Sequence, residues 1–324
     1  MSIPYVTEHD PCYGEALQVA PLVRRVTARN AGRFSGWGTG TYIVGRGEVV
    51  VIDPGPTLNS HRDALSAAIE GERVSKILVT HCHSDHSPLA AWLKELTGAP
   101  TVCFGPHVLN ADWVDDDTDP YEMDDDDKAA KAAAEADGAT EEGHDLDFRP
   151  DIVVADGDIA AEGDGWTISA VHTPGHTSNH TCYHLAQQRL LFSGDHIMGW
   201  STSVITPPDG DMRHYLASLE KVRALAPAAL YPTHGSPASA SSIGCWAVAW
   251  CPGRSHCWVA SRASARAPCC CSCSRSGRNV RCTSAPKKAP NKCACAPSGW
   301  ARYAPSCGCC PKHRYPASWP PSTR

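Results

Sequence analysis

Four side chains that could bind a metal or carry a proton stand within six residues of this sequence. The stretch ILVTHCHSDHSPLAAWL places His81, His83, Asp85 and His86 directly after an apolar, β-branched run. Alternate side chains of an extended chain point the same way, so His81 and His83 can face one point. Asp85 and His86 come where the loop turns into a helix, and can face a second point nearby. Because neutral imidazole and carboxylate groups are good zinc ligands, the spacing predicts a metal site rather than a solvated histidine-rich loop.

Three further ligand candidates lie at the ends of later apolar runs. They are His176 in HTPGHTSNH, Asp195 in FSGDH and His234 in YPTHG. Each follows a short predicted strand and stands beside a glycine, which lets the backbone approach a metal closely. Any one of them alone would be a weak signal, but their order and settings support a single site assembled from several strand ends.

The elements that would position these residues alternate between strands and helices. Gly38–Pro56 predicts two strands around a GRGE turn, and SKILVT predicts the buried strand that delivers the histidine-rich loop. One helix is expected to have Asn59 or Ser60 as its N-cap, and the next to have Ser87. Later strand signals and a final helix in DMRHYLASLEKVRAL continue the pattern. Such an alternation favours an α/β fold built in layers.

An acidic segment interrupts this alternation. Residues 112–147 carry 16 acidic side chains against Lys128 and Lys131. We expect a solvated, partly helical insertion, either a mobile surface loop or a lid over the site. Both interpretations stay open at the level of the sequence.

The six residues His81–His86 read HCHSDH and match the HxHxDH signature of the metallo-β-lactamase superfamily. TPGHT, GD and PTHG match its later motifs in the same order, and Asp53 in VIDPG matches its early aspartate. The resemblance spans roughly Gly36 to Pro237 and is greatest to the glyoxalase II and β-lactamase-like-protein-2 group. It implies the αββα sandwich of that superfamily.

The resemblance also implies two zinc ions per chain. The first would be held by His81, His83 and His176, the second by Asp85, His86 and His234, and Asp195 would bridge them. His180 is expected outside the ligand set, orienting a ligand or touching substrate, and Asp53 is expected to stabilise a loop. The zinc β-lactamases lack this bridging carboxylate, and His83 in place of an acid argues against the di-iron flavoprotein branch.

Two zinc ions about 3.5–4 Å apart can share a hydroxide at neutral pH and polarise the bond under attack. Asp85 is the expected catalytic residue, orienting that hydroxide and passing a proton to the leaving group. The leading hypothesis is a dizinc hydrolase of a small acyl substrate such as a thioester or lactone. The alternative is a single-strand endoribonuclease of the β-lactamase-like-protein-2 type, which needs a basic track for phosphates. Outside the acidic segment, residues 1–236 hold 14 basic and 19 acidic residues, a charge of −5 that mildly disfavours nucleic acid.

The start of the chain does not resemble a signal peptide, and no apolar run approaches the length of a membrane span. We therefore expect a cytoplasmic protein with a small-molecule substrate and no membrane partner. The sequence leaves the oligomeric state open.

The last part of the chain differs in composition from the rest. Residues 1–236 hold 16 basic and 35 acidic residues, whereas residues 237–324 hold 13 basic residues and no acid. This tail also holds 13 of the 17 cysteines and lacks Leu, Phe, Met and Gln. Neither zinc-finger spacing nor a cytoplasmic disulfide framework accounts for it. We expect a metal domain over residues 1–236 and an irregular, out-of-frame tail over 237–324. In the resembling group a small helical domain follows the metal domain, and the composition of this tail does not match it. A third hypothesis follows: the protein binds metal but is inactive because that C-terminal domain is lost.

Overall fold

The structure is a computed structural model that describes residues 10–106, 125–138, 143–206, 209–239, 273–276 and 279–282. The chain divides into two units, one of residues 4–243 and one that contains residues 244–324. In the second unit, β14 (Cys273–Ser276) pairs antiparallel with β15 (Asn279–Cys282). Apart from this hairpin and residues 237–239, the tail expected to be irregular lies outside the described residues.

A seven-stranded sheet forms one layer of the larger unit. In spatial order it contains β1 (Leu17–Ala20), β2 (Val23–Thr27), β3 (Gly40–Arg46), β4 (Glu48–Ile52), β5 (Arg73–Leu78), β6 (Thr101–Cys103) and β7 (Ile152–Val153). Strands β1 to β4 pair antiparallel, and β4 to β7 pair parallel. Parallel neighbours end at the same edge, so the loops after β4 and β5 leave the sheet side by side.

A six-stranded sheet forms the second layer. In spatial order it contains β13 (Ala238–Ser239), β12 (Ala229–Pro232), β11 (Leu190–Gly194), β10 (Thr181–Leu185), β9 (Trp166–His172) and β8 (Ile159–Gly163). A short 3-10 turn, η1 (Ala186–Gln188), joins β10 to β11. Strands β11 and β12 pair parallel, so both end at one edge of this sheet.

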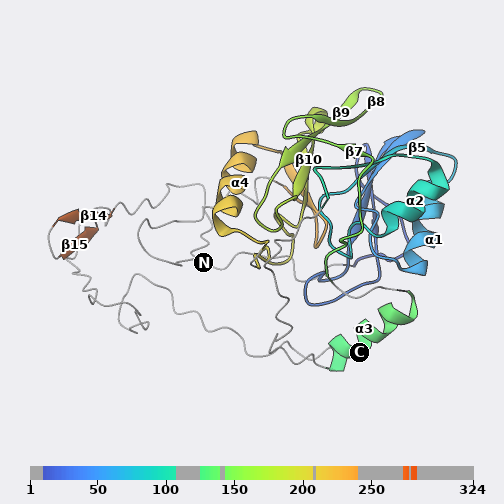
Figure 1. Ribbon diagram of the computed structural model, residues 1–324, viewed down its shortest axis with the longest axis horizontal. Coiled ribbons are helices and arrows are strands. Elements are labelled where there is room, and N and C mark those ends of the chain that lie inside the picture. The colour runs from blue at the N-terminus through green and yellow to red at the C-terminus, as the bar shows by residue number, and fades with distance from the viewer. Residues whose placement is uncertain are drawn as a thin grey trace. The chain divides into compact units, whose positions relative to one another are not determined.

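Helices cover the outer face of each sheet (Figure 1). The helices α1 (Asn59–Ala68) and α2 (Leu89–Thr97) lie on the seven-stranded sheet, and α4 (Met212–Leu225) lies on the six-stranded sheet. The resulting order of helix, sheet, sheet and helix is the αββα sandwich that the sequence implies.

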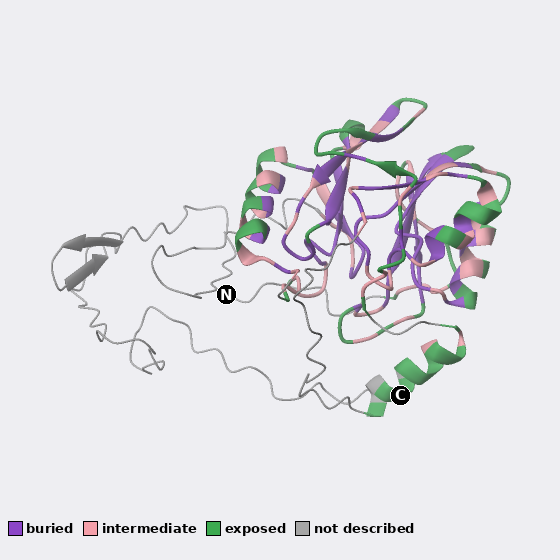
Figure 2. Ribbon diagram, in the orientation of Figure 1, coloured by how far each residue is buried: buried purple, intermediate pink, exposed green. Residues whose placement is uncertain are grey.

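Alternation along the strands explains why the sheets are covered on both faces. In β3, Tyr42 and Val44 pack into the core between the sheets, whereas Ile43 joins the cluster beneath α1 and α2. Phe192 of β11 and Tyr231 of β12 fill the same central core, and the rings of Tyr42 and Phe192 lie 5.1 Å apart. The central strands, such as β3, β4, β10 and β11, are accordingly buried along most of their length (Figure 2).

Helix α1 begins differently from the expectation. Leu58 occupies the position before the helix, and neither Asn59 nor Ser60 caps it with its own side chain. Asp137 supplies the acceptors instead, because its backbone oxygen accepts from the Asn59 N–H at 2.9 Å and its carboxylate from the Ser60 N–H at 3.3 Å. A residue from the acidic segment therefore takes the role of a local cap.

Helix α2 also departs from the expected start. It begins at Leu89 with Pro88 before it, and no side chain caps it. The hydroxyl of Ser87 donates to the carboxylate of Asp145 at 2.6 Å, so it is engaged away from the helix. The expected N-cap role of Ser87 is wrong for this reason.

The acidic segment contains helix α3 (Asp125–Ala136), most of whose described side chains are exposed (Figure 2). The other acid-rich stretches of this segment lie outside the described residues, within 107–124 and 139–142. Among the helices that the structure describes, none is long and apolar enough to cross a membrane.

Candidate metal centre

The structure brings all seven predicted ligands together where strands end. The HxHxDH loop follows β5, and the other three ligands follow β9, β11 and β12. We call His81, His83 and His176 the first group and Asp85, His86 and His234 the second group. Within each group the potential ligand atoms lie no more than 4.8 Å apart, and Asp195 meets the same limit with the first group.

The first group directs three imidazole nitrogens toward one place. His83 Nδ1 lies 2.9 Å from His81 Nε2 and 3.2 Å from His176 Nε2. The Oδ2 atom of Asp195 lies 3.7 Å from His176 Nε2. Three imidazoles with one carboxylate oxygen form a donor set that suits zinc.

The second group combines two imidazoles with a carboxylate. His234 Nε2 lies 3.1 Å from Asp85 Oδ2, and His86 Nε2 lies 3.4 Å from Asp85 Oδ1. The Oδ1 atom of Asp195 lies 3.4 Å from His234 Nε2 and 3.6 Å from His86 Nε2. Asp195 thus turns one oxygen toward each group.

Hydrogen bonds behind the imidazoles determine which nitrogen faces the site. Nδ1 of His176 lies 2.6 Å from the carbonyl oxygen of Val204, and Nδ1 of His234 lies 3.4 Å from that of Gly38. A carbonyl can only accept, so Nδ1 carries the proton in both residues. Each Nε2 therefore faces the site and is available as the ligand atom when it carries no proton.

The same reasoning applies to the two histidines above the buried carboxylate of Asp53. The Thr80 hydroxyl donates its only hydrogen to Asp53 at 2.9 Å, so it accepts from Nδ1 of His81 at 3.0 Å. Nδ1 of His86 donates to Asp53 at 3.0 Å. Both residues therefore also present Nε2 as the ligand atom.

Asp53 lies beneath the site rather than in it. Its side chain is buried and its backbone is left-handed, with φ of 50°. One oxygen accepts from the Thr80 N–H at 2.8 Å, and the other accepts from Thr80, His86 and, at 2.8 Å, Thr233. These contacts join the end of β4 to the ends of β5 and β12, and the loops after β5 and β12 carry ligand candidates of both groups.

The two groups differ in their electrostatics. Burial lowers the pKa of His81 well below the ordinary histidine value, and neighbouring imidazoles lower it further. Burial acts in the same direction on His86 and His234, but the carboxylates of Asp85 and Asp195 outweigh it. They raise the pKa of His86 well above its usual value and that of His234 to about 10. Burial alone would raise the pKa of both carboxyl groups, but the histidines hold it below the usual range.

Two buried polar atoms of this cluster have no hydrogen-bond partner among the residues that the structure describes. They are Nε2 of His86 and Oδ1 of Asp195, and both face the second group. Burying such atoms without a partner costs free energy, and a divalent cation between them would satisfy both. The residues present therefore fit a metal ion, and their donor types suit zinc.

His180 does not join either group. The Asp195 N–H donates to His180 Nε2 at 3.1 Å, and the Nδ1 of His180 lies 2.9 Å from the Thr173 hydroxyl. Its one lone pair is already occupied by the backbone of Asp195, so it orients a ligand candidate from behind.

Two residues that contact the cluster were not found from the sequence. Thr39 donates its hydroxyl hydrogen to Asp85 Oδ2 at 2.8 Å, and His144 packs its ring on His83 with centroids 4.8 Å apart. Thr39 lies in a GTGT run that indicates only a turn before a strand. His144 lies in the acidic segment, where no spacing connects it with the HxHxDH motif.

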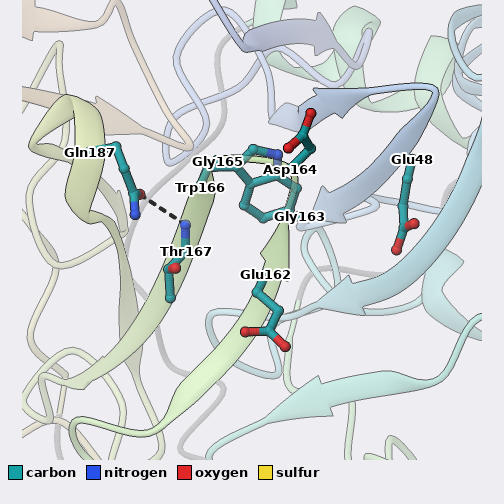
Figure 3. A pocket seen from close by; sticks show the side chains of 8 residues that line it. All are labelled: Glu48, Glu162, Gly163, Asp164, Gly165, Trp166, Thr167 and Gln187. Carbon is teal, nitrogen blue, oxygen red and sulfur yellow. Dashed lines mark hydrogen bonds between the residues drawn. The ribbon is translucent and has the colours of Figure 1, made fainter.

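A hollow on the surface lies away from this cluster (Figure 3). Its lining consists of Glu48, Glu162, Gly163, Asp164, Gly165, Trp166, Thr167 and Gln187. Glu48 and Trp166 begin β4 and β9, whereas the ligand candidates follow the other ends of the strands. The hollow therefore belongs to the opposite end of the sandwich, and none of the ligand candidates lines it.

Comparison with known proteins agrees with this arrangement. A family model described as the metallo-β-lactamase superfamily matches residues 38–234, a range that contains every ligand candidate. The chain belongs to the metallo-β-lactamase superfamily. The resemblance drawn from the HxHxDH, TPGHT, GD and PTHG motifs is confirmed.

Relatives within the superfamily match this chain over part of their length. An atrochrysone carboxyl ACP thioesterase from Paecilomyces divaricatus is 31% identical over 222 residues, which are 68% of this chain and 57% of that protein. A beta-lactamase-like protein 2 homolog from Caenorhabditis elegans is 29% identical over 222 residues, 67% of this chain and 63% of that protein. The chain thus spans less than two thirds of either relative.

A solved superfamily structure shares the fold. The crystal structure of a beta-lactamase domain protein from Burkholderia ambifaria has a TM-score of 0.52 and 22% sequence identity. The match covers 72% of this chain and 71% of that one. This likeness supports the αββα architecture.

Proposed function

We propose that the protein is a dizinc hydrolase that cleaves an acyl thioester. Asp195 carries the dinuclear part of this proposal, because its two oxygens lie 3.7 Å from a nitrogen of the first group and 3.4 Å from one of the second. A carboxylate that faces two sets of ligands suits two cations. The thioesterase name of the Paecilomyces divaricatus relative supports the choice of a thioester over a lactone.

When bound, two zinc ions would generate a nucleophile from water at neutral pH and polarise the substrate carbonyl. The protein's own contribution centres on Asp85, whose side chain is 24% exposed and so is reached by water and substrate. The Thr39 hydroxyl donates to Asp85 Oδ2 and fixes the plane of the carboxylate. Asp85 in this orientation can take a proton from the attacking water and release it to the leaving thiolate.

A hydrolysis panel on the zinc-reconstituted full-length protein tests the proposal. We expect two zinc ions per chain by elemental analysis, and faster turnover of an acyl thioester than of a lactone, a β-lactam or unstructured RNA. RNA cleavage that exceeds thioester cleavage and falls steeply with salt would replace the proposal with an endoribonuclease.

Paired variants separate the ligand assignment from general damage. His83→Ala should abolish hydrolysis, because it removes a nitrogen of the first group. His184→Ala should change the rate only modestly, since His184 lies on β10 outside both groups. Equal losses in the two variants would contradict the ligand set.

We also infer that the metal domain does not depend on the tail beyond residue 243. The family match ends at residue 234, and the two-residue strand β13 closes the sheet beside β12. Limited proteolysis of the full chain should give a zinc-containing core that ends close to residues 237–243. Loss of zinc at the same rate as loss of the tail would show that the tail supports the site, and an inactive core that retains zinc would favour the third hypothesis.

A further inference from the structure

The acidic segment returns to the body beside the metal loop. His83 and His144 form an isolated antiparallel bridge. Next to it, the Ser84 N–H donates to the Gly143 carbonyl at 2.8 Å, and the Gly143 N–H donates to the Ser84 hydroxyl at 2.9 Å. The backbone of the segment is therefore paired with the backbone of the HxHxDH motif itself.

Contacts on the other side of His144 extend this pairing. The Asp145 N–H donates to the Cys82 carbonyl at 2.8 Å, and the Asp145 carboxylate accepts from the Ser87 hydroxyl at 2.6 Å. Residues 143–145 are thus tied to the motif over three consecutive positions. The position of the His144 side chain follows from this pairing.

The pairing sets the His144 ring against a ligand candidate. The ring centroids of His144 and His83 lie 4.8 Å apart, with an angle of 68° between the planes. From other sides His83 meets the rings of His81 at 4.5 Å and His176 at 4.8 Å, both close to perpendicular. Edge-to-face contacts of this kind favour one ring orientation over others.

His83 needs such a contact more than its neighbours do. His81 and His176 present Nε2 to the site and are oriented through Nδ1 by Thr80 and Val204. His83 presents Nδ1, the nitrogen closer to its backbone, and its ring torsion has a broad energy minimum. A rotation of that ring would turn Nδ1 away from the other two nitrogens.

We propose that His144 is a positioning residue for the first group. Its ring packs against His83 and holds the imidazole in the orientation that directs Nδ1 toward zinc. The inference rests on the proposed function, since it takes the first group as zinc ligands. It gives the acidic segment a role in the site that neither a surface loop nor a lid supplies.

Zinc affinity measured directly on the full-length protein provides the test. Competition with a chromophoric chelator resolves the two binding steps, and the visible spectrum of the Co²⁺-loaded protein reports the geometry around the metal. His144→Ala should weaken one of the two steps about tenfold and leave the other unchanged, as is usual when a residue behind a ligand is lost. The Co²⁺ spectrum should change as well.

Three further variants decide how His144 acts. His144→Phe keeps an aromatic ring and should retain zinc affinity within about threefold. His144→Gln keeps polarity without a ring and should behave like His144→Ala. The glutamine variant also provides the test if the alanine variant does not fold. His184→Ala removes a half-buried histidine outside the site and should match the unmodified protein.

The outcomes separate this inference from the proposed function. Fewer than two zinc ions in the unmodified protein would refute the dinuclear proposal before His144 is considered. Two zinc ions with unchanged affinity in both ring-less variants would overturn the role of His144 and leave the proposed function standing. A phenylalanine variant as weak as the alanine variant would overturn ring packing, because the imidazole nitrogens would then be responsible.

Discussion

The two groups of ligands are held in place by different means. Around the first group the supporting contacts come from the Thr80 hydroxyl, the Val204 carbonyl and the ring of His144, none of which is a carboxylate. Around the second group a buried carboxylate, Asp53, receives a hydrogen bond from one histidine, and the Thr39 hydroxyl fixes the remaining carboxylate. The second group therefore has a direct hydrogen bond to a buried carboxylate that the first group lacks, so loss of that carboxylate should affect the two groups unequally.

The carboxylates around the second group favour the protonated form of its histidines. Carboxylates raise the pKa of His234 to about 10 although its burial favours the neutral form, whereas His81 stays neutral. A cation bound to the second group would take the place of the protons that these carboxylates attract. Among the described residues, Asp195 is the carboxylate whose two oxygens face the two groups.

Of the changes that compare the two groups, removal of Asp195 should have the largest effect, because it acts on both groups at once. Asp195→Ala should reduce the zinc content from two ions to one and lower thioester hydrolysis by more than about a hundredfold. Elemental analysis and initial rates measure the two quantities. Asp164→Ala, which removes an exposed acid from the hollow of Figure 3, is the matched control and should change neither. Two tightly bound zinc ions in Asp195→Ala would mean that the groups do not share this residue.

The next largest effect should follow from Asp53→Asn. It should be greater on the second group, whose His86 donates to Asp53 directly, than on the first, which Asp53 reaches only through Thr80. The new amide would direct hydrogens at groups that already donate to Asp53, namely Thr80, His86 and Thr233. We expect the zinc of the second group to bind about 10–100-fold more weakly, with the affinity of the first changed less. If chelator competition showed a greater loss of zinc affinity at the first group than at the second, the proposed difference between the groups would be wrong.

The sequence predicted both the layers and the cluster of candidate ligands at the strand ends, because local patterns indicate them. Strand alternation such as Tyr42, Ile43 and Val44 specifies two covered faces, and a polar motif after an apolar strand must emerge at the sheet edge. In layered α/β folds that edge is where ligands bind. The resemblance of their motifs to the superfamily predicted one site for His81 and His234, which are 153 residues apart in the chain.

What the sequence did not predict depends on distant parts of the chain. Asp137 binds Ser60 across 77 positions, and Asp145 binds Ser87 across 58. Both expected caps were wrong, because Asp137 supplies the acceptors at the start of α1 and Asp145 engages Ser87 away from α2. His144 reaches His83 by the same return, and neither its residue type nor its spacing could reveal that contact.

A smaller effect is expected at Thr39, whose hydroxyl orients Asp85. Thr39→Val keeps the shape of the side chain and removes the hydrogen bond to the carboxylate. A hydrogen bond to a charged group contributes about 1.5–3 kcal/mol, so we expect hydrolysis to fall roughly tenfold or more. Thr39→Ser restores the hydroxyl and should recover most of the rate. An equal loss in both variants would show that packing of the methyl group, not orientation of Asp85, is responsible.

The smallest effect concerns a titratable residue behind the second group. His61 of α1 is 2% exposed and lies against the loop that follows Asp53, where a side chain at Gly55 would approach its ring to 2.8 Å. The Thr41 hydroxyl donates to the Asp53 carbonyl at 2.6 Å, so it accepts from His61 Nε2 at 2.9 Å. Burial lowers the pKa of His61 to about 4.

This lowered pKa predicts a loss of stability in mild acid. Between pH 6.5 and pH 4 the unfolded chain binds a proton at His61 that the folded protein does not, so the free energy of unfolding falls as the pH falls through that window. From pH 7 to pH 5.5 the loss assigned to this residue is about 1 kcal/mol. Urea unfolding of the zinc-free protein at both pH values measures it, with His61→Gln as the control that retains a donor for Thr41 but does not titrate. Over this interval the free energy of unfolding should fall by about 1 kcal/mol less in the glutamine variant than in the unmodified protein. Identical decreases in the two proteins would show that protonation of His61 does not cause the acid sensitivity.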